Sequence, residues 1–122
     1  MKSTLNKIMI YAKDMQKMSL FYEKYFDYKA KIDKDERIIE LSSAYGGSTI
    51  LIHQAGKGVK EGQACIKLVF DVKNVEKFRD KYIAAGLKFG SVHEADGYSF
   101  SNAKDPGKNT IQISSRAFRK NV

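Results

Sequence analysis

The chain has 122 residues, of which 43% are hydrophobic, a size and composition that suit one compact domain or two small modules sharing a sheet. Its formal net charge of +8 favours anionic ligands. Basic residues mostly alternate with acids and no nucleic-acid-reading motif is present, so we expect no nucleic-acid partner. No segment resembles a membrane span or a leader, and the single cysteine, Cys65, excludes an internal disulfide. We therefore expect a soluble, cytoplasmic protein without a membrane partner.

The first half of the chain predicts one strand, one helix and three further strands. Residues 5–11 alternate as a strand does, and Asp14 is a good N-cap for a helix over Met15–Phe26. Apolar residues recur in that helix at spacings of three and four, a stripe expected to pack on a sheet: Met15, Met18, Tyr22, Tyr25 and Phe26. The three strands are predicted at residues 29–33, 37–42 and 48–54, the first two separated by a turn at 34–36.

The second half follows a linker, residues 55–62, whose three glycines favour flexibility. An apolar strand is predicted at 65–72, and Asn74 caps a helix over 75–85 that Gly86 ends. Three strands complete it, at residues 88–94, 98–102 and 110–115. In the turn Asp105-Pro106-Gly107-Lys108-Asn109, Pro106 presets φ, while Gly107 and Asn109 tolerate positive φ.

The two halves repeat one another. The strand-like run Lys7-Ile8-Met9-Ile10 corresponds to Lys67-Leu68-Val69-Phe70, and Asp14 corresponds to Asn74. The ends correspond too, as Thr49-Ile50-Leu51-Ile52 matches Thr110-Ile111-Gln112-Ile113. A tandem duplication of one βαβββ unit, and hence an α+β fold, is predicted.

Three features carry a resemblance to a known family. They are Lys13-Asp14-Met15 before the helical run 21–26, the Asp105-Pro106-Gly107 turn before Thr110, and the paired βαβββ layout. Together they resemble the vicinal-oxygen-chelate superfamily of glyoxalases, bleomycin-resistance proteins and extradiol dioxygenases. The resemblance implies a cupped mixed sheet with helices on the outside, one domain over residues 1–122 with modules at about 5–55 and 63–118, and a homodimer.

Metalloenzymes of that family hold one divalent ion with ligands on the first and last strand of each module. By this resemblance the ligand positions fall on Lys7, Lys67, Leu51 and Gln112. A protonated lysine has no lone pair, leucine has no donor atom, and Gln112 offers only a weak carbonyl oxygen. We therefore expect the family's metal site to be absent and no cofactor to be required.

Other residues are candidates for the same cup. Lys7 and Lys67 would need an anion or an internal acid such as Glu40 between them, unless their ammonium groups reach water. His53 shares strand parity with Leu51 and is a candidate for an acid or base, and His93 and Glu94 are candidates to act with it. An apolar lining is expected from Tyr11, Tyr98 and Phe100, whereas Met9 is expected in sheet packing and Cys65 as a small buried residue.

Three functions remain open at this point. The first is binding of a small organic molecule, neutral or anionic, in a metal-free cup between the modules. The second is a metal-dependent lyase or dioxygenase whose ligands are displaced, involving His53, His93 and Glu40. The third is drug sequestration, as in the bleomycin-resistance members, although a charge of +8 disfavours cationic glycopeptides.

Overall fold

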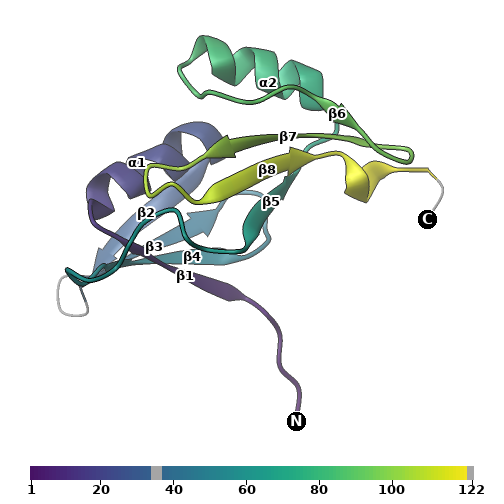
Figure 1. Cartoon of the computed structure of the whole chain (residues 1–122). Helices are drawn as coiled ribbons and strands as arrows, with labels where there is room; N and C mark the ends of the chain where they lie inside the picture. Colours follow the sequence, from purple (N-terminus) through teal and green to yellow (C-terminus); the bar gives the residue numbers. More distant parts are fainter. Residues whose placement is uncertain (34–36, 121–122) are drawn as a thin grey trace. The chain divides into compact units, whose positions relative to one another are not determined.

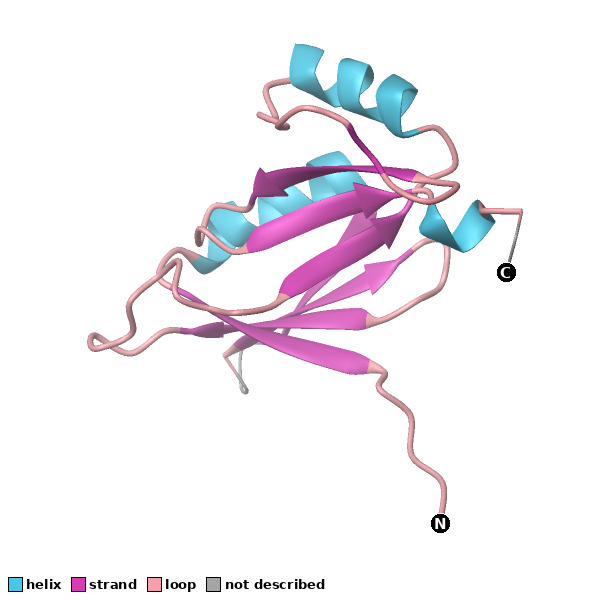
Figure 2. Cartoon of the chain, turned by 45° about the vertical axis from the view of Figure 1, so that its right-hand side comes forward, coloured by secondary structure: helices cyan, strands magenta, loops and turns pink. Residues whose placement is uncertain are grey.

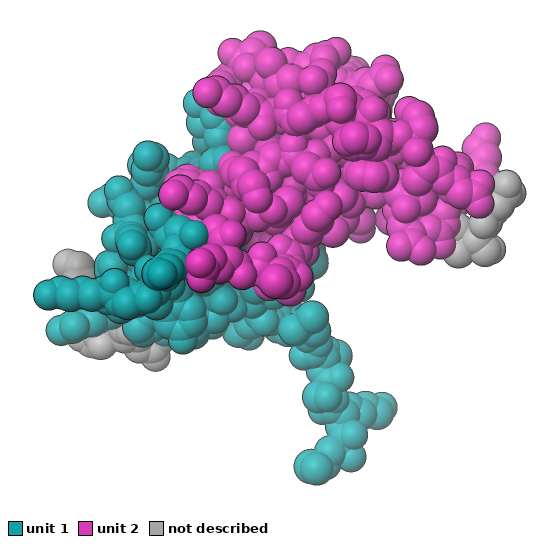
Figure 3. Space-filling view, in the orientation of Figure 1, with its two compact units in different colours: residues 1–61 teal, residues 62–122 magenta. Residues whose placement is uncertain are grey.

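The computed structural model describes residues 1–33 and 37–120, and the chain divides into two compact units, residues 1–61 and 62–122 (Figure 3). Each unit has a four-stranded mixed sheet and one α-helix (Figures 1 and 2). The division falls in the predicted linker, and residues 55–66 form no helix or strand. The α+β class and the tandem βαβββ arrangement are confirmed.

The sheet of the first unit has the strand order β1-β4-β3-β2. Its strands are Lys7–Ala12 (β1), Tyr28–Asp33 (β2), Ile38–Ser43 (β3) and Thr49–Gln54 (β4). β1 is parallel to β4, and the other neighbouring strands are antiparallel. All four strands were predicted with small shifts at their ends, and the turn predicted at residues 34–36 lies outside the described residues.

Helix α1, Met15–Phe26, packs on this sheet and contacts all four of its strands. The helix begins where predicted, because the side chain of Asp14 accepts a hydrogen bond from the Lys17 N–H at 3.0 Å. The predicted apolar stripe is buried, together with a residue not included in it, Phe21, whereas Met15 is only partly buried. Opposite it, the sheet buries aliphatic side chains from alternate strand positions: Ile10, Ile39, Leu41, Ile50 and Ile52. One face of the sheet is therefore the core of the unit.

The second unit repeats this plan with the strand order β5-β8-β7-β6. Its strands are Lys67–Asp71 (β5), His93–Glu94 (β6), Ser99–Lys104 (β7) and Thr110–Ser114 (β8), and a 3-10 helix, Arg116–Phe118 (η1), follows the last strand. β5 is parallel to β8, as β1 is to β4. Ile111 and Ile113 are fully buried at the positions equivalent to Ile50 and Ile52.

Helix α2, Val75–Ala84, is capped as predicted, because the Asn74 side chain accepts a hydrogen bond from the Lys77 N–H at 3.0 Å. It is much less buried than α1, and Val75 is its only fully buried residue. The chain leaves it through Gly86 at φ 109°, a conformation that suits glycine. Within the described residues, no helix has the length and apolarity that crossing a membrane requires.

Two strands of the second unit depart most from their predicted ranges. β5 begins at Lys67 rather than residue 65, and Cys65 is exposed, so its prediction as a small buried residue was wrong. The strand predicted at 88–94 is reduced to His93–Glu94. In its first part the Gly90 N–H donates to the Asn102 carbonyl of β7 at 2.8 Å. The Gly90 carbonyl accepts side-chain hydrogen bonds instead, from Arg79 Nε at 2.7 Å and Ser101 Oγ at 3.0 Å, so the ladder does not continue.

The turn between β7 and β8 is organised by the buried Asp105 carboxylate. It accepts hydrogen bonds from the backbone N–H groups of Gly107 and Asn109, both at 2.9 Å, and from the Asn109 side chain. The residue at positive φ is Lys108, at 64°, rather than Gly107 or Asn109, the two residue types that tolerate this conformation best. Asn109 contributes through its side-chain amide, and this holds the turn closed without a glycine at the left-handed position.

Candidate functional site

The face of the first sheet opposite α1 carries five of the predicted site residues. Strand alternation buries Ile10, Ile50 and Ile52 beneath the helix, and so turns the intervening residues to the other side. In the register of the strands, Tyr11 lies opposite His53, and Leu51 lies opposite Glu40. Lys7 occupies the same face at the start of β1 and is exposed. We call this surface, which presents Lys7, Tyr11, Glu40, Leu51 and His53, the first open face.

His53 is held in a defined orientation on the first open face. Its ring lies 5.4 Å from the Tyr11 ring, centroid to centroid, and its Nδ1 lies 2.9 Å from the Gln54 carbonyl oxygen. A carbonyl oxygen can only accept, so this hydrogen bond requires the proton on Nδ1. In the neutral ring Nε2 then keeps its lone pair, which makes it an acceptor for a ligand hydroxyl or amide. Met9, predicted in sheet packing, is 42% exposed on the same face.

The second unit has an equivalent surface, which presents Lys67, Asn102 and Gln112 and which we call the second open face. Lys67 and Gln112 both contact Asn102, which was not among the predicted site residues. Gln112 Nε2 donates to Asn102 Oδ1 at 3.0 Å, and Lys67 Nζ donates to the same oxygen at 3.4 Å. Lys67 is exposed, which agrees with the alternative in which its ammonium group reaches water. Asn102 lies directly opposite Gln112 in the sheet, so its position followed from strand pairing once the register was known.

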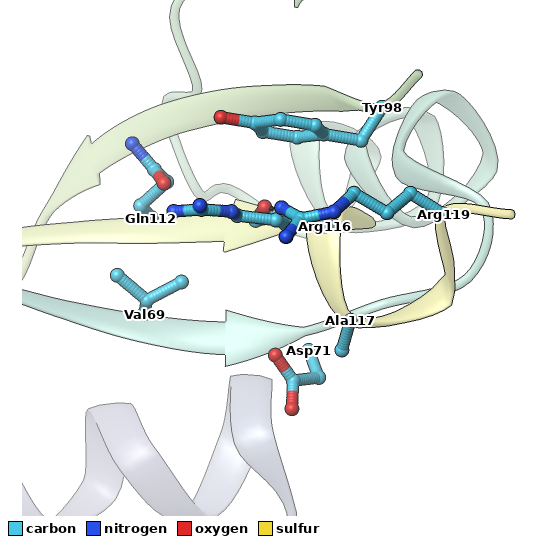
Figure 4. A pocket seen from close by; sticks show the side chains of 8 residues that line it. Val69, Asp71, Tyr98, Gln112, Arg116, Ala117 and Arg119 are labelled. Carbon is cyan, nitrogen blue, oxygen red and sulfur yellow. Dashed lines mark hydrogen bonds between the residues drawn. The ribbon is translucent and has the colours of Figure 1, made fainter. Parts of the chain in front are cut away.

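A hollow of about 410 Å³ lies on the second open face, at the end where β8 leads into η1 (Figure 4). Its lining combines strand residues with residues of the C-terminal segment: Val69, Asp71, Tyr98, Gln112, Ser114, Arg116, Ala117 and Arg119. The volume is in the range of small-molecule sites, roughly 300–1,000 Å³. Gln112 and Tyr98 were expected to line a cup between the modules, and the two arginines were not among the predicted site residues.

The two arginines are placed by the same aromatic ring. The guanidinium carbons of Arg116 and Arg119 lie 5.7 Å and 6.0 Å from the centre of the Tyr98 ring, within the range of cation–π contacts (Figure 4). The buried Ser114 hydroxyl accepts a hydrogen bond from the Arg116 N–H at 3.1 Å and so fixes the start of η1. The signal in the sequence is the basic cluster Arg116, Arg119 and Lys120, which has no acidic neighbour and follows directly after a buried strand.

The remaining candidates lie apart from this hollow. His93 is exposed on the short edge strand β6 and stacks on Phe100, with centroids 5.2 Å apart. Glu94 is exposed beside it on β6. Cys65 precedes β5 and is exposed. None of the three lines the hollow, so the structure does not assemble them with Gln112.

The donor atoms at the family's ligand positions do not suit a divalent cation. Lys7 and Lys67 carry ammonium groups, Leu51 has no donor, and the Gln112 amide already donates to Asn102. Among the described residues, no group of three or more histidine, cysteine, aspartate or glutamate side chains is arranged to hold a metal ion. These residues do not fit the ion that the fold family implies.

Comparison with protein families gives one match, which covers most of the chain. The family model described as "Glyoxalase/Bleomycin resistance protein/Dioxygenase superfamily" matches residues 4–113. No curated protein matches the sequence significantly.

Solved structures share the fold at low sequence identity. The structure of UcmS2 is 14% identical with a TM-score of 0.79, covering 94% of this chain and 99% of that one. TnmS3, described as an antibiotic binding protein from Streptomyces sp. CB03234, is 12% identical with a TM-score of 0.76, covering 92% and 94%. Lactoylglutathione lyase from Agrobacterium tumefaciens is 13% identical with a TM-score of 0.71, covering 93% of both chains. At these identities the likeness shows the fold alone.

Proposed function

The chain belongs to the Glyoxalase/Bleomycin resistance protein/Dioxygenase superfamily, and from this premise we propose that it binds a small organic molecule without a metal ion. The observation that carries the proposal is the hollow on the second open face, which combines an aliphatic wall at Val69, an aromatic ring at Tyr98 and an amide at Gln112. Such a mixture of apolar surface and a few oriented polar groups is typical of ligand sites.

The chemistry of the ligand positions supports binding rather than the metal-dependent reactions of the superfamily. Those reactions use the ion to polarise an oxygen atom, and the residues at its ligand positions here are lysine, leucine and glutamine. The description of TnmS3 as an antibiotic binding protein shows that this fold serves binding in another protein. By the same reasoning we propose that the five residues of the first open face contribute to binding, with His53 Nε2 as an acceptor.

The metal-free part of the proposal is tested by elemental analysis. Protein purified without chelator is analysed directly, and again after incubation with nickel, zinc, manganese or iron and desalting. We expect substoichiometric metal in each case. Retention of one divalent ion per chain would show that other residues supply the ligands and would favour the lyase or dioxygenase alternative.

The binding part is tested with a neutral aromatic probe, N-phenylnaphthylamine, whose fluorescence rises in an apolar site. We expect saturable binding by the chelator-treated protein and NMR amide shifts centred on Val69 and Gln112. Gln112→Ala should weaken binding, whereas Lys77→Gln, an exposed change on α2, should leave it unchanged. Absence of saturable binding, or shifts confined to the helix face, would contradict the proposal.

A further inference from the structure

A second hollow adjoins the first and shares its arginines. It measures about 760 Å³ and is lined by Lys73, Asp96, Gly97, Tyr98, Ser115, Arg116, Phe118, Arg119 and Lys120. Three of these residues, Tyr98, Arg116 and Arg119, also line the first hollow. The two arginines therefore lie at the border between the first hollow, which is lined by an aromatic ring and an amide, and the second hollow, which is strongly basic.

The charges of this region are poorly balanced. The second hollow is lined by four cationic side chains and one carboxylate, Asp96. In the part of the chain that the structure describes, no carboxylate lies within 4.0 Å of the guanidinium groups of Arg116 and Arg119. Their guanidinium N–H groups also donate no hydrogen bond to another described residue, although both lie against the Tyr98 ring. Two cations on one ring repel each other, and a bound anion removes that repulsion.

The backbone that carries the arginines is well anchored. Ser115 is tied to β7 twice, since its N–H donates to the Ser99 carbonyl and its hydroxyl accepts from the Ser99 N–H, both at 3.0 Å. The hairpin between β6 and β7 closes with a hydrogen bond from the Ala95 N–H to the Tyr98 carbonyl at 2.8 Å. The tip of that hairpin reaches η1, since a Cβ atom on Gly97 would lie 3.8 Å from the Arg119 Cβ. Preorganised donors lose less entropy when an anion binds them.

We propose that the ligand is an aromatic acid, with its ring in the first hollow and its carboxylate, sulfonate or phosphate group on Arg116 and Arg119. The inference rests on the proposed binding function and adds the chemical class of the ligand. Guanidinium groups bind planar or tetrahedral oxyanions through paired N–H donors, while Val69, Tyr98 and Gln112 are suited to a ring that bears few charges. Lys73 and Lys120, in the second hollow only, add long-range attraction.

The test compares two probes with the same ring system, neutral N-phenylnaphthylamine and anionic anilinonaphthalene sulfonate. We expect the sulfonate to bind the chelator-treated protein more tightly, with an affinity that falls as salt rises. The double variant Arg116→Gln/Arg119→Gln should weaken the sulfonate by roughly tenfold to a hundredfold, the range for losing a hydrogen bond to a charged group, and should weaken the neutral probe much less, so that the ratio of the two affinities falls. Arg116→Lys/Arg119→Lys should give an intermediate loss, because it keeps charge without the planar donors.

The matched control is Lys77→Gln/Lys88→Gln, which removes two positive charges from exposed sites of the same unit that line neither hollow. This control should change sulfonate binding by less than about twofold, since distant surface charges are screened. Thermal melts confirm that every variant is folded. Two results would overturn the aromatic-acid inference while leaving the binding function intact. One is equal affinity for both probes. The other is a loss of sulfonate affinity in Lys77→Gln/Lys88→Gln as large as that in Arg116→Gln/Arg119→Gln. Failure of both probes to bind would overturn both.

Discussion

Replacing Asp105 should destabilise the second unit by removing the acceptor that closes the β7–β8 turn. Its side chain is 4% exposed and accepts four hydrogen bonds within the β7–β8 turn. In Asp105→Ala the buried N–H of Gly107 and the partly buried N–H of Asn109 both lose their acceptor. Because each buried unsatisfied donor costs about 1–3 kcal/mol, we expect a loss of about 2–4 kcal/mol in the free energy of unfolding.

A smaller loss is expected for Asp105→Asn. The amide oxygen can replace Oδ1, which accepts three of the four hydrogen bonds. The amide nitrogen then replaces Oδ2 and faces the Asn109 side-chain nitrogen, now 2.9 Å from Oδ2, so that two donors oppose each other. One hydrogen bond to a charged group is lost, and the expected cost is about 1–2 kcal/mol. The double variant Asp105→Asn/Asn109→Asp should recover part of this loss, because the new carboxylate at position 109 accepts from the amide at 105.

The assay is urea denaturation followed by far-UV circular dichroism, since the chain has no tryptophan. The shift in midpoint multiplied by the slope gives the change in stability, provided that the slope is unchanged. If Asp105→Ala and Asp105→Asn both cost less than about 0.5 kcal/mol, a value typical of exposed surface sites, the carboxylate does not hold the turn. An absence of coupling in the double variant would show that Asn109 is not its partner.

Three further outcomes follow from the same geometry. Asn74→Ala should cost about 1 kcal/mol by leaving the Lys77 N–H without its cap, with faster amide hydrogen exchange at the start of α2; unchanged exchange there would contradict the capping role. Tyr22→Ala should lower the free energy of unfolding by about 3–5 kcal/mol in urea denaturation, because Tyr22 is fully buried. Tyr82→Ala, at the repeat-related position, should lower it clearly less, because Tyr82 is not fully buried. Equal losses in the two variants would refute this prediction. Burial raises the pKa of the Tyr28 phenol, so the stability that the neutral phenol contributes is present below about pH 10 and is lost as pH rises through the folded pKa. In an ultraviolet titration, Tyr28→Phe should lack the late-ionising phenol of the parent protein. A titration curve unchanged by the substitution would contradict this assignment.

The helices and their caps were predictable from sequence because their signals are local. Asp14 and Asn74 each stand three residues before the N–H that they accept from, and both caps are present. The core face of the first sheet followed from strand alternation, which also placed the five predicted residues of the first open face together. Their role in binding stays a prediction.

The misses arise where a non-local interaction replaces a local preference. The strand predicted at 88–94 is mostly lost because Arg79 and Ser101, from other elements, take the Gly90 carbonyl. The positive φ in the β7–β8 turn falls on Lys108, which the sequence did not single out, because Asp105 and Asn109 close the turn around it. The hollow could not be predicted, since it depends on η1 bringing two arginines beneath Tyr98 after the last strand has ended. Asn102 needed the β7–β8 register before its contact with Gln112 could be recognised.

The parallel pairing of the first and last strand in each unit has a consequence for folding. Lys7 pairs with Thr49 and Lys67 with Thr110, so each parallel pair must wait for a partner that is synthesised about 40 residues later. The hairpins β2–β3 and β3–β4 join nearby segments and can form early, whereas we expect β1 to join the edge strand β4 last. On the ribosome, residues 1–61 contain every strand of their own sheet and can finish folding before the second unit emerges. No strand pair among the described residues joins the two units, so we expect the duplicated chain to fold in two consecutive steps, each limited to about half of its length.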